Sequence, residues 1–218
     1  MGGLVINTNL SSLNSQRVLE NSHRELGKSI NRISSGVKIE GATDGVGELA
    51  LSESILSDIA ALKQGSRNVK NGTALLNLAE GALNELSGIL LRLRSLASQN
   101  ANGTLAATER ETVNLEYQAS LAEIDRIASS TEFNGTFLLK GALSKSATEH
   151  IVLQAGVDTQ SVNQLDLNEL ANLGDVGTSA LGLEGAEITT QGSSFLALND
   201  LTKAIDTLLD ARGRLGTA

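Results

Sequence analysis

Asn31-Arg-Ile-Ser-Ser-Gly-Val-Lys-Ile-Glu-Gly-Ala-Thr-Asp-Gly-Val-Gly-Glu-Leu-Ala-Leu-Ser-Glu-Ser54 contains four glycines between positions 36 and 47, with helical patterns on both sides. Each glycine inside a helix costs roughly 0.5–1 kcal/mol relative to alanine, so a regular helix through this stretch is unfavourable. Because the chain has no proline, glycine must supply its helix breaks. The stretch therefore predicts a helix, a glycine-rich spacer over residues 37–46 that ends at a Thr43 or Asp44 cap, and a second, longer helix.

Before the spacer, apolar residues follow one face of a helix over residues 10–37. Ser11 or Ser12 is placed to cap the start of this helix. The apolar stripe advances by steps of seven, four and three residues, which is helical spacing: Leu19, Leu26, Ile30 and Ile33. Because an isolated amphipathic helix is marginal in water, we expect residues 1–45 to be poorly ordered or unpaired in a monomer.

After the spacer, the pattern predicts one helix over residues 47–99, which would be roughly 75–80 Å long at 1.5 Å per residue. Its apolar stripe runs through Ser66 and Thr73, shifts by three residues and continues from Ala79, as in a heptad with one stammer. Glycines inside this range are weak points, and Asn71-Gly72 could mark a break.

The remaining elements are shorter. Thr108 with Glu111 forms a capping-box pattern, and the apolar spacing predicts helices over residues 108–129 and 194–214. Alternating residues predict a β-hairpin region over residues 133–168, with a bulge or slip because Val162 is out of phase with its neighbours. Residues 169–193 are glycine-rich and predict a loop. The fold class is therefore mainly α, a long antiparallel coiled-coil-like rod with a small β-hairpin region.

The composition argues against several functional classes. Aromatic residues make up 2% of the chain, cysteine is absent and the net charge is -8. The absence of cysteine excludes disulfides and thiolate metal sites, and the negative charge disfavours nucleic acid and anionic membranes as partners. We find no membrane-spanning run, no cleavable signal peptide, no catalytic motif and no metal-ligand cluster, so we expect no enzyme activity and no cofactor.

A set of short strings along the chain gives a more specific result when the strings are taken in order. The strings are Ile6-Asn-Thr-Asn-Leu-Ser-Ser-Leu13, Ile33–Ser54, Val69–Leu78, Leu93–Thr104, Glu123-Ile-Asp-Arg126 with Phe133-Asn-Gly135, and Leu198–Gly216. In this order and at these spacings the chain resembles bacterial flagellin, the subunit of the flagellar filament. Much of the family's outer variable domain is missing, and the family's carboxy-terminal helix would follow Ala218.

The resemblance implies that the chain is organised into three segments with different roles. Residues 1–36 would form a filament-core helix, residues 37–46 the spacer and residues 47–218 the rod domain. It also implies a structural protein that polymerises with itself into the extracellular flagellum for motility. Export would use the flagellar secretion apparatus and a secretion chaperone, without a cleaved signal peptide.

The resemblance also assigns roles to residues of the rod. Arg92, Leu96 and Glu116 match the family surface that contacts a neighbouring subunit and that the flagellin-sensing Toll-like receptor binds. We expect Leu96 to be an exposed apolar residue among polar neighbours, and we expect the receptor to bind this chain if the two meet. The plainer interpretation of Arg92 and Arg94 is that they flank a helical seam and pair with acids.

Two alternatives to a filament subunit remain open at this point. The hook–filament junction protein, a hook-associated relative of flagellin, shares the helical ends. A non-polymerising helical binding module would account for the heptads but not for the hairpin or the spacer.

Overall fold

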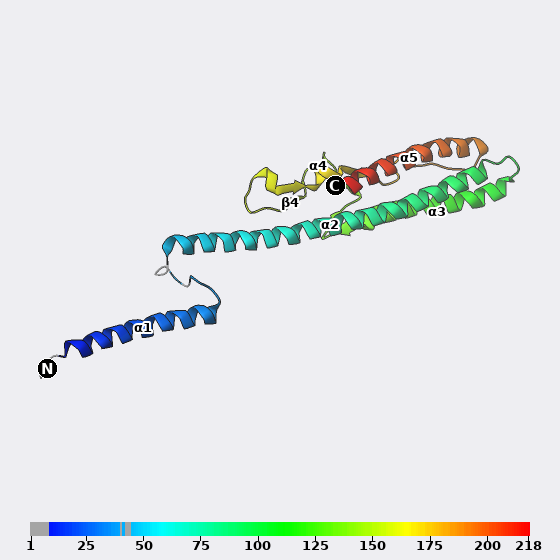
Figure 1. The fold of residues 1–218 in the computed structure, drawn as a ribbon. Helices are drawn as coiled ribbons and strands as arrows, with labels where there is room; N and C mark the ends of the chain where they lie inside the picture. The colour runs from blue at the N-terminus through cyan, green and yellow to red at the C-terminus, as the bar shows by residue number, and fades with distance from the viewer. Residues whose placement is uncertain (1–8, 40, 42–44) are drawn as a thin grey trace. The chain divides into compact units, whose positions relative to one another are not determined.

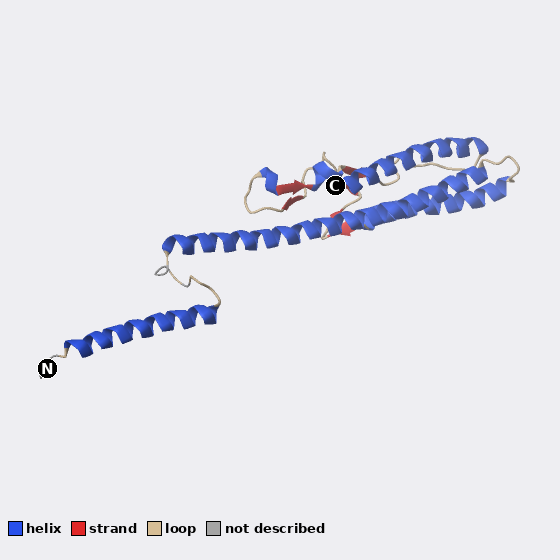
Figure 2. Cartoon of the chain, in the orientation of Figure 1, coloured by secondary structure: helices blue, strands red, loops and turns tan. Residues whose placement is uncertain are grey.

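The computed structural model describes residues 9–39, 41 and 45–218. The chain divides into two compact units, residues 1–60 and 61–218, and α2 runs through the boundary between them. Long helices dominate, and the strands form small antiparallel pairs, so the expected mainly α fold class is confirmed (Figures 1 and 2). The long helices are α1 (Leu10–Ser35), α2 (Val46–Asn100), α3 (Ala107–Ser130) and α5 (Gln191–Thr217).

Helix α1 carries its own end signals. The side chain of Asn9 accepts a hydrogen bond from the Ser12 amide at 3.2 Å, so the cap is Asn9 and the prediction of Ser11 or Ser12 was wrong. At the other end, Gly36 adopts a left-handed φ of 72° and donates its amide to the Arg32 carbonyl. No residue of α1 is buried. The spacer caps proposed at Thr43 and Asp44, and the start of the chain up to residue 8, lie outside the described residues.

Helix α2 is continuous through Asn71-Gly72, so no break occurs there. Its buried face follows an unbroken heptad, and the stammer predicted from the apolar stripe was wrong. Ser66 and Thr73 are exposed, and the buried position lies one residue earlier in each turn. Glycine is one of the packing residues of this heptad, whose buried positions are Gly65, Gly72, Ala79, Leu86, Leu93 and Asn100.

Gly65 and Gly72 allow residues 153–155 to approach α2 closely. A Cβ atom at Gly65 would overlap the Ala155 carbonyl, and one at Gly72 would overlap the side chain of Leu153. The amide of Asn68, on the same helix, donates to the Gln154 carbonyl at 2.9 Å. The hydrogen bond from Asn68 and the missing side chains of the two glycines thus bring the segment 153–155 directly against α2.

Helix α3 folds back along the second half of α2. Its buried apolar residues recur with helical spacing: Tyr117, Leu121, Ile124, Ile127 and Ala128. It begins at Ala107, and the Glu109 carboxylate accepts a hydrogen bond from the Ala106 amide at 3.0 Å. The predicted Thr108–Glu111 capping box was therefore wrong: the N-cap is Ala106, whose side chain cannot accept a hydrogen bond, and only the glutamate half of the pattern is present, at Glu109.

The β-region contains three antiparallel strand pairs instead of one hairpin. Strands β1 (Glu132–Phe133) and β2 (Thr136–Phe137) join through an Asn134-Gly135 turn in which both residues have positive φ. The other pairs are β3 (Lys140–Leu143) with β6 (Leu173–Asp175), and β4 (Val152–Gln154) with β5 (Gln164–Asp166).

The expected irregularity in this region is a bulge and not a slip. The β4–β5 ladder keeps its register, and at its turn end the Ala155 and Gly156 amides share the Asn163 carbonyl, as in a bulge. The predicted loop over residues 169–193 contains strand β6 and most of the short helix α4 (Leu167–Ala171). Because β6 pairs with a strand about thirty residues earlier, no local pattern could identify it.

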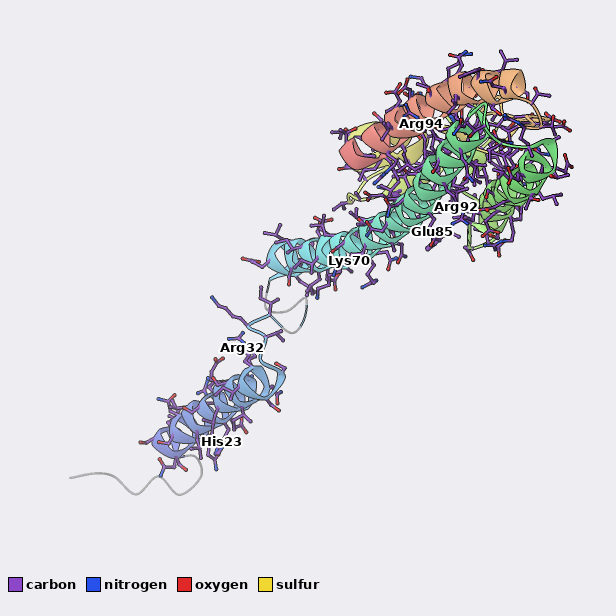
Figure 3. The ribbon with its side chains drawn as sticks, turned by 90° about the vertical axis from the view of Figure 1, so that its right-hand side faces the viewer. His23, Arg32, Lys70, Glu85, Arg92 and Arg94 are labelled. Atoms are coloured by element: carbon purple, nitrogen blue, oxygen red, sulfur yellow. The ribbon has the colours of Figure 1, made fainter. Side chains whose placement is uncertain are left out.

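One hydrophobic core joins these elements of the second unit. Helix α5 lies beside α2 and α3 in the views of Figures 1 and 3, and it starts earlier than predicted because Thr190 caps it. Its buried residues recur with helical spacing: Ser194, Ala197, Leu201, Ala204, Leu208, Ala211 and Leu215.

Gly65→Ala should destabilise the second unit by about 1–3 kcal/mol, because the added methyl group meets backbone that cannot rotate away. Gly81→Ala and Gly88→Ala are matched controls on the same helix, since nothing lies within 4 Å of their added Cβ atoms. They should stabilise the protein by roughly 0.5–1 kcal/mol. Urea unfolding followed by circular dichroism measures all three, and equal stabilisation by all three would contradict the close approach.

Candidate interaction surfaces

The first candidate surface is the apolar face of α1. The predicted stripe residues have relative exposures between 56% and 82%: Leu19, Leu26, Ile30 and Ile33. Full burial of one such side chain is worth about 1.5–3 kcal/mol, so the face gains considerably when another surface covers it. The expected poor order of this helix in a monomer stays a prediction.

The second candidate surface lies where α3 packs against α2. Arg92 on α2 donates its Nε–H to the Glu116 Oε1 on α3 at 3.0 Å, and its terminal nitrogen bonds the same oxygen. Both side chains remain largely exposed. Two of the three residues that the resemblance singled out, Arg92 and Glu116, are therefore brought together, and Arg92 pairs with an acid, as in the plainer interpretation.

Leu96 does not lie on this surface. Its relative exposure is 7%, and it belongs to the hydrophobic core. The expectation that it is exposed was wrong because Leu96 lies between Leu93 and Ala97 on the buried face of α2. It packs in the core and does not present an apolar side chain to a partner.

Arg94 lies near a shallow groove at the end of α2. Arg92 and Arg94 are both exposed on the second half of this helix (Figure 3). The exposed apolar residue of the groove is Leu91, which sequence reasoning missed because it lies one residue beyond the stripe position Leu90. The groove is lined by Leu91, Arg94, Ser95, Ser98, Gln99 and Leu105.

A buried polar cluster fixes the backbone beneath this surface. The Asn100 amide donates to the carbonyls of Arg110 and Ile188, and Asn114 accepts from the Ile188 amide at 3.0 Å. Gln118 donates to the Ala186 carbonyl at 2.7 Å. Sequence reasoning missed this cluster because polar residues on a helix normally face solvent; here they satisfy the backbone of residues 186–188.

Within residues 9–39, 41 and 45–218, no group of three or more His, Cys, Asp or Glu side chains is arranged to hold a metal. Burial, with Asp200 nearby, raises the pKa of Tyr117 to about 12, so this phenol stays protonated at neutral pH. His23 is exposed on α1 (Figure 3). None of the helices in the described part of the chain is long and apolar enough to cross a membrane.

Arg92→Ala and Glu116→Ala should each lower the free energy of unfolding by less than about 1 kcal/mol, because exposed ion pairs are screened by water and salt. Leu96→Ala should cost about 2–5 kcal/mol, because it leaves a cavity in the core. A double-mutant cycle by urea unfolding measures the pair. A Leu96→Ala effect as small as that of Arg92→Ala would contradict the burial of Leu96.

Known proteins resemble this chain in sequence. A family model of the bacterial flagellin N-terminal helical region matches residues 6–144. The chain is 40% identical over 149 residues to flagellin FlaB1 of Treponema pallidum, covering 68% of this chain and 52% of that protein. It is 32% identical over 217 residues to the flagellar filament 30.7 kDa core protein of Treponema maltophilum, covering 98% and 76%. The chain thus spans about half of the first relative and about three quarters of the second.

Solved structures show the same fold. The crystal structure of Bacillus cereus flagellin superposes with a TM-score of 0.58 at 29% identity, covering 69% of this chain and 81% of that one. The structure of FliC from Burkholderia pseudomallei, at 17% identity and a TM-score of 0.52, supports the fold alone. Because the family model covers more than half of the sequence, the chain belongs to the bacterial flagellin family.

Proposed function

We propose that this protein is a non-enzymatic structural subunit that assembles with copies of itself into the extracellular flagellar filament used for motility. The observation that carries the proposal is the apolar face of α1, a 26-residue helix in which no residue is buried. Named relatives are flagellar filament core proteins, which supports the filament subunit over the hook–filament junction protein or a non-polymerising binding module.

Burial of the α1 face would supply the driving force for assembly. In this proposal residues 1–36 form the filament core, residues 37–46 the spacer and residues 47–218 the rod, which packs laterally. A contact between two different surfaces of the subunit, repeated without closure, gives an open helical filament. The flagellar export apparatus and a secretion chaperone are the proposed partners before assembly.

We further propose that the surface around Arg92 and Glu116 contacts a neighbouring subunit and is recognised by the flagellin-sensing Toll-like receptor. The observation in favour is that both side chains are exposed and paired, next to the groove that contains Leu91 and Arg94. A rigid, preorganised ion pair loses little side-chain entropy when a partner binds it. Leu96 is buried in the core and is not part of the proposed surface.

Changing both Leu26 and Ile30 to Ser in the full-length protein should raise the critical concentration for polymerisation at least tenfold. The physical reason is that each change removes apolar area that assembly would bury. Sedimentation and electron microscopy measure the effect. Val18→Ser is the matched control, since Val18 is 59% exposed on the same helix but lies off the stripe.

Amide exchange supplies a second readout of the same experiment. Residues 10–35 should exchange rapidly in the monomer and slowly in the filament, because covering the apolar face stabilises the helix. Normal polymerisation of the variant with both Leu26 and Ile30 changed to Ser, or strong amide protection of this helix in a proven monomer, would contradict the proposed role of α1.

Arg92→Ala and Glu116→Ala should each weaken receptor binding about tenfold, because each breaks a charged contact without unfolding the rod. Receptor affinity by surface plasmon resonance is the measurement. Lys203→Ala is the control, since Lys203 forms a comparable exposed ion pair with Asp200 on α5. Equal losses in all three variants would indicate a general charge effect and would contradict a specific surface.

A further inference from the structure

Helix α4 and its two caps hold the connector between β3 and β4. Asn168 is fully buried, and its amide nitrogen donates to the carbonyls of Ala142 and Ser144 at 2.8 Å each. Its side-chain oxygen accepts the Ile151 amide at 2.8 Å. Asn168 thereby satisfies backbone groups at both ends of the connector, residues 144–150.

Two further contacts hold the first half of the connector. The Lys145 amide donates to the side chain of Asn172, the left-handed cap of α4, at 3.0 Å. The Lys145 ammonium lies 2.6 Å from a carboxylate oxygen of Glu169. Neither contact involves a group that ordinarily titrates near neutral pH.

The second half of the connector is held by a histidine. His150 Nδ1 lies 2.6 Å from Asp166 Oδ2, and both side chains are about two thirds buried. The other oxygen of Asp166 accepts the amides of Asn168 and Glu169 at 2.9 and 3.3 Å, so it caps α4. One carboxylate therefore joins the imidazole of the connector to the start of the helix.

We propose that the His150–Asp166 pair is a pH-dependent latch, which holds residues 144–150 against α4 when the imidazole is protonated and loosens them when it is neutral. This inference goes beyond the proposed filament function and does not depend on it. Among the contacts between α4 and the connector in the described structure, this is the one with a side chain whose charge ordinarily changes near neutral pH.

The charges around the ring set the direction of the effect. The hydrogen bond to Asp166 raises the pKa of His150 above its usual 6.5, outweighing burial, while the Lys145 backbone and the Glu169 carboxylate act in the same direction as Asp166. The Lys145 ammonium pairs with Glu169 and so offsets part of that charge. Burial raises the pKa of Asp166, but hydrogen bonds from His150 and two backbone amides outweigh it and hold the pKa below 3.8.

These two shifts define the pH window of the latch. Because the pKa of His150 is raised on folding, its contribution is fully present below pH 6.5 and is lost as the pH rises through the folded-state value. Because the pKa of Asp166 is lowered, its contribution is present above pH 3.8 and is lost as the pH falls through its folded-state value. The latch is therefore fully closed between about pH 4 and 6.5, and it loosens as the pH rises through the raised pKa of His150 or falls through the lowered pKa of Asp166.

Loss of the His150–Asp166 contact should loosen the connector alone. The contacts of Asn168 do not titrate, and the Leu153–Leu165 pairing keeps β4 on β5. The seat of β4 on Gly65 and Gly72 is also independent of pH. We therefore expect the connector to open while the rod stays folded.

The first test is an NMR titration of His150 in the full chain with His23→Gln, which leaves a single imidazole signal. The midpoint should lie above 6.5, and adding Asp166→Asn should return it toward 6.5. Asn caps helices as well as Asp does, so this variant removes the charge and keeps the cap. A midpoint at or below 6.5, or one that Asp166→Asn leaves unchanged, would overturn the latch.

The second test is amide exchange across residues 144–150, corrected for the intrinsic effect of pH. Protection should fall as the pH rises through the His150 midpoint, and the ratio of its low-pH to high-pH values should follow the measured rise in the pKa. In His150→Gln the protection should already be low and should not follow this titration. Protection that stays constant in the native chain, or falls equally in His150→Gln, would contradict the proposal.

Discussion

The heptad line on the buried face of α2 is the constraint on which the rest of this protein depends. The size and polarity of its residues change along the helix and select what can pack there. Glycines at 65 and 72 allow a strand to pack there, while Ala79, Leu86 and Leu93 belong to the core shared with α3 and α5. At the last position of this heptad, Asn100 donates hydrogen bonds to the backbone carbonyls of Arg110 and Ile188.

A buried asparagine side chain holds irregular backbone at two places in the second unit. Asn100 and Asn168 are both fully buried, and each donates its side-chain amide to two backbone carbonyls. A buried carbonyl without a donor costs about 1–3 kcal/mol, so one well-placed asparagine can stabilise a segment that has no regular structure. A core with few aromatic residues therefore relies on helical seams and on these amides to order its loops.

The two candidate surfaces differ in what they need from a partner. The face of α1 is apolar and gains stability only when it is covered, which suits permanent burial in an assembly. The surface around Arg92 and Glu116 is polar, and its charges are already paired, so it does not need a partner to be stable. In the proposed function, both features belong to one subunit, which exists before and after polymerisation.

The sequence by itself determined the long helices, because their signal is local: apolar residues that recur every three or four positions report the buried face directly. It also determined the family, through short strings in a fixed order. Only the tertiary structure decided that Gly65 and Gly72 are packing positions, that β3 pairs with β6 and that Leu96 is buried. Each of these depends on a partner distant in sequence, and a glycine or an isolated leucine looks the same in a sequence whether or not that partner lies against it.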